Sequence, residues 1–268
     1  MTQFILYYRK SLMEEDELRA ARKYFTCVDL LSEIPKNSFV VGRFSLYPFY
    51  YDQQRELACN NSKLINTHSQ YQYIADLKNY VYDLKELTPK TWDRLEDLPE
   101  NTKFILKGET NSRKNAWKTS MFANNKKEAI EVHGKLCEDT LIGNQNIYIR
   151  EYVPLYKYID GIGGMPVTKE YRFFVAFGEV ISSGFYWQNY LEDIGEVPDV
   201  NEVPKEFIKE VIARVGANSN FYVIDVALTK ENKWIVIELN EGQFSGLSCN
   251  DPDVLYKNLK EALLKNVI

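Results

Sequence analysis

The stretch FYVIDVALTKENKWIVIELNEGQ, residues 221–243, contains two apolar segments that are each interrupted by one acid. Residues 221–229 and 234–240 have the composition of strands, and the polar residues between them predict a hairpin. Asp225 lies in the first strand and Glu238 in the second. An ionised carboxylate in such a setting costs several kcal/mol unless a cation or hydrogen-bond donors compensate it. The hairpin therefore predicts a binding site for positive charge.

The register of the hairpin brings the two acids together. A four-residue loop pairs Thr229 with Trp234, and that register places Asp225 directly opposite Glu238. Asn240 shares the face of Glu238 because side chains alternate along a strand. Adjacent carboxylates repel unless one is protonated or a hard divalent cation lies between them, and Mg²⁺ prefers oxygen ligands. We therefore expect Asp225, Glu238 and Asn240 to bind Mg²⁺. The alternative is one acid in water at a strand end and the other paired with a lysine.

Mg²⁺ commonly keeps substrate phosphates among its ligands, so cations for a polyphosphate are expected elsewhere in the chain. Lys107 ends the apolar strand 104–107 and precedes a polar loop that carries Arg113, Lys114 and Lys118. Such a loop covers phosphates with backbone N–H groups and mobile ammonium groups. Its other interpretation is an exposed hairpin with solvated lysines.

Two further strands carry polar groups of interest. Arg172 lies within EYRFFVAF, where a guanidinium needs an anion: a phosphate or carboxylate ligand, or a structural partner such as Glu170 or Glu151. In YIREYVPL, the strand ends at Glu151, Tyr152 and Val153 before a proline. An extended backbone that leaves a strand there offers its N–H and C=O groups to the edge of an adenine.

The other predicted elements give an α+β chain with an α/β beginning. They are a strand at 3–8, helices at 14–24 and 71–81, a strand at 117–122, a helix at 126–138, a strand at 147–153, a helix at 205–215 and a terminal helix. The strands on either side of Gly178-Glu179 predict a hairpin with a type II′ turn, with glycine at its first central position. The strand and helix at the start predict a small α/β domain in residues 1–90.

Composition limits the kind of protein this chain forms. Its 33 Lys and Arg against 38 Asp and Glu give a net charge of −5, which argues against a broad basic face for nucleic acid. Cys27, Cys59, Cys137 and Cys249 are scattered without a CxxC pair, so neither a zinc cluster nor a disulfide framework is expected, and a cytoplasmic location fits. No apolar run approaches the roughly 20 residues of a membrane span, so no membrane partner is expected.

The chain resembles the ATP-grasp superfamily from about residue 90 to its end. The motifs that carry the resemblance are Lys107, Lys114, IREYVP at 149–154, EYRFFV at 170–175, VIDVAL at 223–228 and IELNEGQFSGLS at 237–248. In detail it resembles the clade distinguished by conserved arginine and lysine positions and frequent in bacteriophage and bacterial genomes. It differs from many relatives because a glycine-rich loop is missing at 109–117, where Asn111-Ser112-Arg113 stands instead.

The resemblance implies an ATP-grasp fold with ATP between two α+β domains, and ATP and Mg²⁺ as cofactors. It implies an N-terminal α/β domain at 1–90, a central ATP-grasp subdomain at 91–153 and a C-terminal one, with the Mg²⁺ site, at 154–268. The implied site residues are Lys107 and Lys114 at phosphates, Glu151 with the backbone of Tyr152 and Val153 at adenine, Arg172 at the γ-phosphate or acyl phosphate, and Asp225, Glu238 and Asn240 at Mg²⁺. Arg172 and Lys107 are the expected catalytic residues, and the hairpin register independently selects the three metal ligands.

The activity implied is ATP-dependent ligation of a small-molecule or peptide carboxylate to an amine, through an acyl phosphate. Gln243, Ser245 and the segment 42–51 are expected to face the acceptor site. Two other classes stay open: a nucleotide-binding module without turnover, and an enzyme that acts on a nucleic-acid end or base. The last class needs a platform for stacking and phosphate contacts, made of Arg43, Tyr47, Phe49, Tyr50 and Tyr51.

Overall fold

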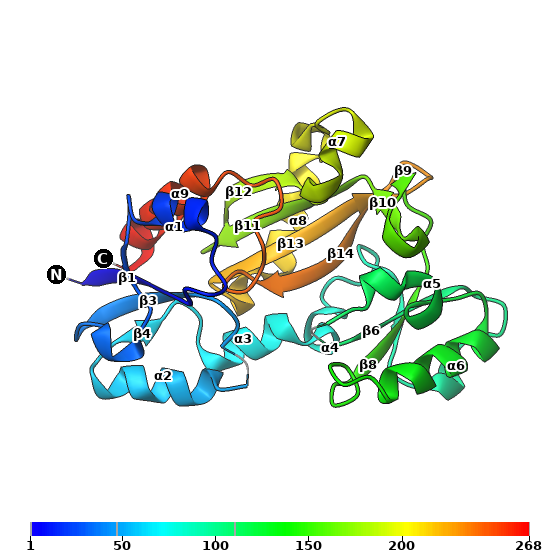
Figure 1. Cartoon of the computed structure of the whole chain (residues 1–268), viewed down its shortest axis with the longest axis horizontal. Coiled ribbons are helices and arrows are strands. Elements are labelled where there is room, and N and C mark those ends of the chain that lie inside the picture. The colour runs from blue at the N-terminus through cyan, green and yellow to red at the C-terminus, as the bar shows by residue number, and fades with distance from the viewer. Residues whose placement is uncertain (1, 47, 110, 268) are drawn as a thin grey trace.

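The computed structural model describes residues 2–46, 48–109 and 111–267, and these residues form three four-stranded sheets and one two-stranded sheet (Figure 1). The first sheet has the order β2-β1-β3-β4 with parallel pairing throughout. Its region contains β1 (Gln3–Tyr8), α1 (Glu15–Ala21), β2 (Thr26–Val28), β3 (Ser38–Arg43), α2 (Tyr50–Cys59), β4 (Lys63–Leu64), α3 (His68–Ala75) and α4 (Leu77–Tyr80). Five of the six residues of β1 are buried, as expected for a parallel strand covered on both faces.

The α/β beginning of the chain is confirmed, but its helices are shorter than predicted. The helix expected at 71–81 is two helices, α3 and α4, that meet at Asp76. Asp76 has an extended backbone, and its side chain accepts a hydrogen bond from the backbone N–H of Lys78. The hydroxyl of Tyr148 donates to the same carboxylate at 2.5 Å. A capping acid therefore ends one helix and starts the next, which apolar spacing alone does not indicate.

The second sheet is antiparallel with the order β5-β8-β6-β7. Its elements are β5 (Thr91–Trp92), β6 (Phe104–Gly108), α5 (Trp117–Ser120), β7 (Phe122–Ala123), α6 (Lys126–Cys137) and β8 (Ile147–Glu151). The strand predicted at 117–122 is wrong, because most of it is the single turn α5. Trp117 stacks on Phe122 across that turn, with ring centroids 6.2 Å apart, so the two aromatic residues pack within the turn and do not extend along a strand.

The third sheet is antiparallel with the order β12-β11-β13-β14, and a small hairpin lies at its edge. The elements are β9 (Lys157–Asp160), β10 (Pro166–Thr168), β11 (Glu170–Ala176), β12 (Glu179–Phe185), α7 (Leu191–Ile194), α8 (Lys205–Val215), β13 (Phe221–Leu228), β14 (Trp234–Glu241) and α9 (Pro252–Val267). The helix at 205–215 and the terminal helix are confirmed. The type II′ turn is wrong: the central residues are Phe177 and Gly178, both with positive φ (49° and 78°), as in a type I′ turn.

The predicted register at the acids is confirmed, although the pairing at the loop is not. Trp234 pairs with Leu228 and not with Thr229, but Asp225 still pairs with Glu238. The register shifts between Asp225 and Val226 because Ile237 is an extra residue on β14. A β-bulge therefore compensates the one-residue difference at the loop before the two acids are reached.

The sheets and the apolar core divide the chain differently. Each four-stranded sheet lies within one of the ranges 1–90, 91–153 and 154–268, and the division into three domains stays a prediction. One apolar cluster nevertheless joins Phe4 of β1 to Phe174 of β11. The same cluster includes residues of α1 and α9, which lie side by side in Figure 1. Among the described residues, no helix is both long and apolar enough to cross a membrane.

We expect opposite effects from two glycine-to-alanine substitutions. A Cβ at Gly184 of β12 would lie 2.5 Å from backbone atoms of Cys249, so Gly184→Ala should lower the free energy of unfolding by about 1–3 kcal/mol. Gly134 is exposed inside α6, and nothing lies within 4 Å of an added Cβ, so Gly134→Ala should raise it by about 0.5–1 kcal/mol. Urea unfolding of both variants measures this. Equal stability of Gly184→Ala and the parent would show that the loop at Cys249 yields freely.

Candidate active site

The third sheet brings the three predicted metal ligands to one face, beside Arg172. Arg172 lies on β11 opposite Asp225 of β13, and Asp225 lies opposite Glu238 of β14. Asn240 donates from Nδ2 to Oδ2 of Asp225 at 3.1 Å. The side chain of Asp225 is fully buried. Four residues that are far apart in the sequence therefore form one polar cluster in an apolar sheet.

Each of the two acids has its own cation. Arg172 binds Asp225 through two hydrogen bonds, from Nε to Oδ1 at 2.9 Å and from Nη2 to Oδ2 at 2.7 Å. Lys107 of β6 donates to Glu238. Burial alone would raise the pKa of Glu238, but the ammonium groups of Lys107 and Lys114 hold it well below its usual range. The repulsion between the acids is thus offset by cations of the chain itself.

This arrangement settles the alternatives for Arg172 and Glu238. The structural partner of Arg172 is Asp225, so its pairing with Glu170 or Glu151 is wrong. Of the alternative given for the acids, only the part that pairs one of them with a lysine is confirmed. Burial opposes the charge on Arg172, but the neighbouring Asp225 carboxylate raises the pKa of its guanidinium.

Lys114 is held between aromatic rings and is not a solvated lysine. Its Nζ donates to the hydroxyl of Tyr186 at 2.6 Å and lies 4.5 Å from the centre of that ring and 5.2 Å from the ring of Trp187. The guanidinium of Arg172 lies 4.8 Å from the Tyr186 ring. Tyr186 therefore positions both cations. Arg113 pairs instead with Asp139, at 2.6 and 2.7 Å.

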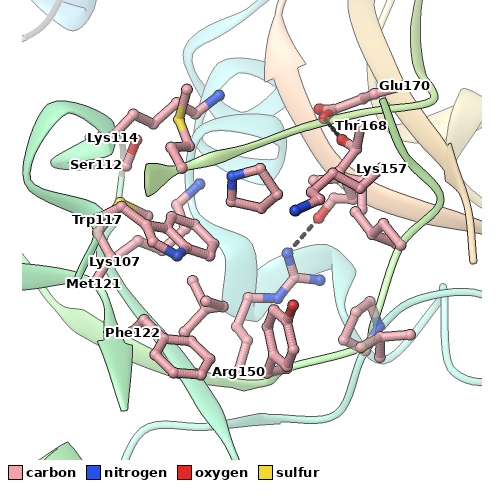
Figure 2. Close-up of a pocket in the computed structure, with 18 of the residues that line it drawn as sticks. Lys107, Ser112, Lys114, Trp117, Met121, Phe122, Arg150, Lys157, Thr168 and Glu170 are labelled. Carbon is pink, nitrogen blue, oxygen red and sulfur yellow. Dashed lines mark hydrogen bonds between the residues drawn. The ribbon is translucent and has the colours of Figure 1, made fainter. Parts of the chain in front are cut away.

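A cavity of about 330 Å³ lies between the second and third sheets. Ile105 and Lys107 line it from the second sheet, and Ile237 and Glu238 from the third. Figure 2 shows the apolar side chains of its wall on one side, and polar side chains on the other. The apolar ones are Trp117, Met121 and Phe122, and the polar ones are Lys157, Thr168 and Glu170. An apolar half and a cationic half suit a ligand with a flat ring and a polyanionic tail.

The residues predicted for adenine, Glu151, Tyr152 and Val153, all line this cavity. The backbone N–H of Tyr152 already donates to the carbonyl of Lys103 at 2.8 Å. The prediction for an adenine edge is therefore limited to the Tyr152 carbonyl and the Val153 N–H. The aromatic ring of Tyr152 meets that of Phe122 edge to face, which fixes this wall of the cavity.

Two residues of the site were missed by the sequence reasoning. Arg150 is buried on β8, where it donates to the carbonyl of Ile237 and, at 2.7 Å, to the hydroxyl of Thr88. Burial lowers the pKa of its guanidinium. Glu170 is buried in the same cavity, where burial raises its pKa to about 7, against the effect of Lys114. A charge inside an apolar strand, the signal that selected Arg172, also marks Arg150.

The donor set of the polar cluster fits Mg²⁺. Two carboxylates and an amide are hard oxygen donors on one face, which is the chemistry that Mg²⁺ prefers. Within the described ranges, no group of three or more His, Cys, Asp and Glu side chains is placed to hold a metal ion. A bound Mg²⁺ would therefore complete its ligands with the Asn240 amide oxygen, phosphate oxygens and water. Arg172 and Lys107 must then shift from the carboxylates, and the phosphates offer them another anion.

The platform for nucleic acid is not formed. Arg43 is buried and donates from Nε to Glu17 at 2.8 Å. Tyr50 is buried and stacks on Tyr71 with ring centroids 4.3 Å apart. Phe49 and Tyr51 are exposed, while Tyr47 lies outside the described residues. Because the one arginine and the central tyrosine are in the core, neither presents a surface to bases or phosphates.

Solved structures with the same fold support this interpretation of the cavity. They include D-cycloserine synthetase DcsG (TM-score 0.59, 13% identity, 97% of this chain and 98% of that chain). A RimK domain ATP-grasp protein from Sphaerobacter thermophilus is similar (TM-score 0.60, 12% identity, 97% and 99%). So is macrocyclase MdnC bound with precursor peptide MdnA from Microcystis aeruginosa (TM-score 0.55, 12% identity, 98% and 100%). No curated protein matches by sequence.

The fold and the cavity between two sheets thus define an ATP-dependent protein of the ligase class. A sequence profile for an ATP-grasp domain matches residues 94–259; it is family 3 of the clade named for its conserved arginine and lysine positions. The chain therefore belongs to the ATP-grasp superfamily and, within it, to this arginine–lysine clade. ATP and Mg²⁺ are the cofactors of this family, and one similar structure, the ligase PsnB, was solved with Mg and ADP. The predicted fold, family and cofactors are confirmed, and the individual site residues stay predictions.

We expect Arg172→Met to destabilise the fold strongly. The change leaves the buried Asp225 carboxylate with the Asn240 amide but no cation, which should cost about 3–5 kcal/mol of unfolding free energy. Urea unfolding measures the loss, and Arg172→Met combined with Asp225→Asn should recover part of it because the uncompensated charge is removed. Arg94→Met, which breaks the exposed pair with Glu96, is the matched control and should change little. A loss no larger than that of the control would contradict the assignment.

Proposed function

We propose that this protein is an ATP-dependent carboxylate–amine ligase that works through an acyl phosphate. The observation that carries the proposal is the cluster of Lys107, Lys114 and Arg172 around the paired acids, where the two smaller cavities meet. Lys114 and Glu238 line both cavities, of about 330 and 320 Å³. A nucleotide whose ring lies between Trp117 and Val153 would direct its phosphates to this cluster.

The proposed roles follow from charge and position. Lys107, Lys114 and Arg172 neutralise the γ-phosphoryl group while a substrate carboxylate oxygen attacks its phosphorus, and the bond to the β-phosphate oxygen breaks to give ADP. Asp225, Glu238 and Asn240 would hold Mg²⁺, which supplies further positive charge at the phosphates. No nucleophile of the chain is needed. Arg172 and Lys107 act as the catalytic residues because their charges offset the negative charge that develops on the transferred group.

The second half of the reaction forms the new bond. An amine nitrogen attacks the acyl carbon, the carbon–oxygen bond to phosphate breaks, and inorganic phosphate leaves. An ammonium group releases two protons on becoming an amide, one to phosphate and one to solvent. One similar structure is a synthetase of the small molecule D-cycloserine, and another is a macrocyclase bound with a precursor peptide. We propose a small-molecule or peptide carboxylate as the donor accordingly.

Calorimetry of ADP binding, with and without Mg²⁺, tests the nucleotide site. We expect ADP to bind, Mg²⁺ to tighten the binding, and the double variant Asp225→Asn, Glu238→Gln to lose only the Mg²⁺-dependent part. Lys114→Met should weaken ADP binding about tenfold because it removes a charge-assisted hydrogen bond. Lys118→Met is the matched control, because Lys118 is exposed in the same loop and does not line the cavity. An unchanged Mg²⁺ effect in the double variant would refute the metal assignment.

Trapping with hydroxylamine tests the acyl phosphate. With ATP and a panel of carboxylates, an acyl phosphate reacts with hydroxylamine to a hydroxamate, while ADP accumulates. We expect hydroxamate and ADP to form together for the correct donor, and Arg172→Lys to reduce both rates by at least about tenfold because the planar two-pronged guanidinium is lost. ADP binding without hydroxamate from any donor in the panel would favour a nucleotide-binding module without turnover.

A further inference from the structure

A second, larger cavity lies beside the phosphate end of the nucleotide site. Phe244, Ser245 and Gly246 line both the cavity of about 320 Å³ that contains Arg172 and a cavity of about 800 Å³. The carbonyl of Gly246 accepts a hydrogen bond from Nη1 of Arg172 at 2.8 Å, which fixes this shared wall. A ligand in the larger cavity therefore lies one short loop away from the group that is expected to meet the transferred phosphoryl group.

The wall of the larger cavity is acidic. Four consecutive acids, Glu14, Glu15, Asp16 and Glu17, line it at the start of α1. Arg43 is the one basic side chain among its lining residues, and the carboxylate of Glu17 neutralises it. Acids in a first turn also stabilise a helix, so the cluster alone does not define a site. It does mean that an anion entering here is repelled and a cation is attracted.

Buried polar groups of the same cavity lack partners. Asn250 is 4% exposed, and its Nδ2 donates to the carbonyl of Leu247 at 2.9 Å, but its Oδ1 accepts no hydrogen bond from the described residues. Gln243 is fully buried, and its Nε2 likewise has no partner in the described part of the chain. A buried acceptor without a donor is costly, and an ammonium or amine N–H group satisfies it. The free Nε2 suits an oxygen or an unprotonated nitrogen of the same ligand.

We infer that the larger cavity binds the amine acceptor and that this acceptor carries a second positive charge. The inference rests on the proposed function. The reacting nitrogen would lie near Asn250 and the shared wall, while a second ammonium group would lie at Glu14, Glu15 and Asp16. A diamine, or an amine in a basic peptide, has this chemistry. The carboxylate donor is not the occupant, because a carboxylate would face three acids that no arginine of the cavity neutralises.

Binding of three probes of equal length tests the charge preference. Putrescine carries two ammonium groups, butylamine carries one, and γ-aminobutyrate carries an ammonium and a carboxylate. We expect calorimetry on the protein loaded with ADP and Mg²⁺ to give the affinity order putrescine, butylamine, γ-aminobutyrate, with a difference between the first two that shrinks as salt is added. Equal affinities, a preference for γ-aminobutyrate, or no binding of putrescine at millimolar concentration would overturn the inference.

The double variant Glu14→Gln, Glu15→Gln locates the preference. Both side chains are exposed, so the fold should be unaffected, and putrescine affinity should fall about fivefold while butylamine affinity stays the same. The matched control is Glu131→Gln, Glu138→Gln, which removes two exposed acids at α6 and should have no effect. Equal loss in both double variants would assign the effect to net charge and overturn the site.

Nucleotide binding in the same samples separates this inference from the function on which it rests. If ADP does not bind, the ligase proposal fails. If ADP binds and hydroxamate forms, but the three probes are bound alike, the ligase proposal stands and the charge preference is wrong. If γ-aminobutyrate binds best, the larger cavity accepts the carboxylate donor, contrary to the inference.

Discussion

The buried ion pair between Arg172 and Asp225 is the constraint on which the site depends. A fully buried carboxylate is tolerated only with a cation and good hydrogen-bond geometry, and Arg172 supplies both through two parallel hydrogen bonds. The same guanidinium donates to the carbonyl of Gly246, and the carbonyl of Arg172 accepts from Asn250 at 3.4 Å. One side chain therefore joins the face of the third sheet to the loop that separates the two sides of the site. Gly184, opposite Arg172, leaves the space that this loop needs.

The two walls of the nucleotide cavity are held together by polar contacts as well as by packing. Lys107 of the second sheet binds Glu238 of the third, and Arg150 binds the carbonyl of Ile237. Most of the apolar core of the second sheet forms its own cluster, apart from that of the third. Polar contacts across a cleft are ones that phosphates and a cation compete for, since they offer the same charges. The ligand-free ion pairs thus keep the charges of the site compensated and in place.

How far the sequence predicts this structure depends on the range of each contact. The pairing of Asp225 with Glu238 follows from one hairpin, and it was predicted correctly because the bulge at Ile237 offsets an error at the loop. The partner of Arg172 was not predictable in the same way, because β11 reaches β13 only through the strand order of the whole sheet. Apolar periodicity also carries no information about a cap such as Asp76 or about the turn formed by α5. Arg150 was within reach, since the reasoning used for Arg172 applies to it.

The distribution of charge around the shared wall gives the proposed reaction a direction. Lys107, Lys114 and Arg172 lie on one side of Phe244–Gly246, and the acids of α1 line the cavity on the other. An anionic nucleotide and a cationic acceptor would each be repelled from the other's cavity, so the two ligands sort themselves without a moving part. Their reactive ends meet at the wall, where opposite fields overlap and the acyl group must lie. A net charge of −5 says little about such a site, because what matters is where each sign is gathered.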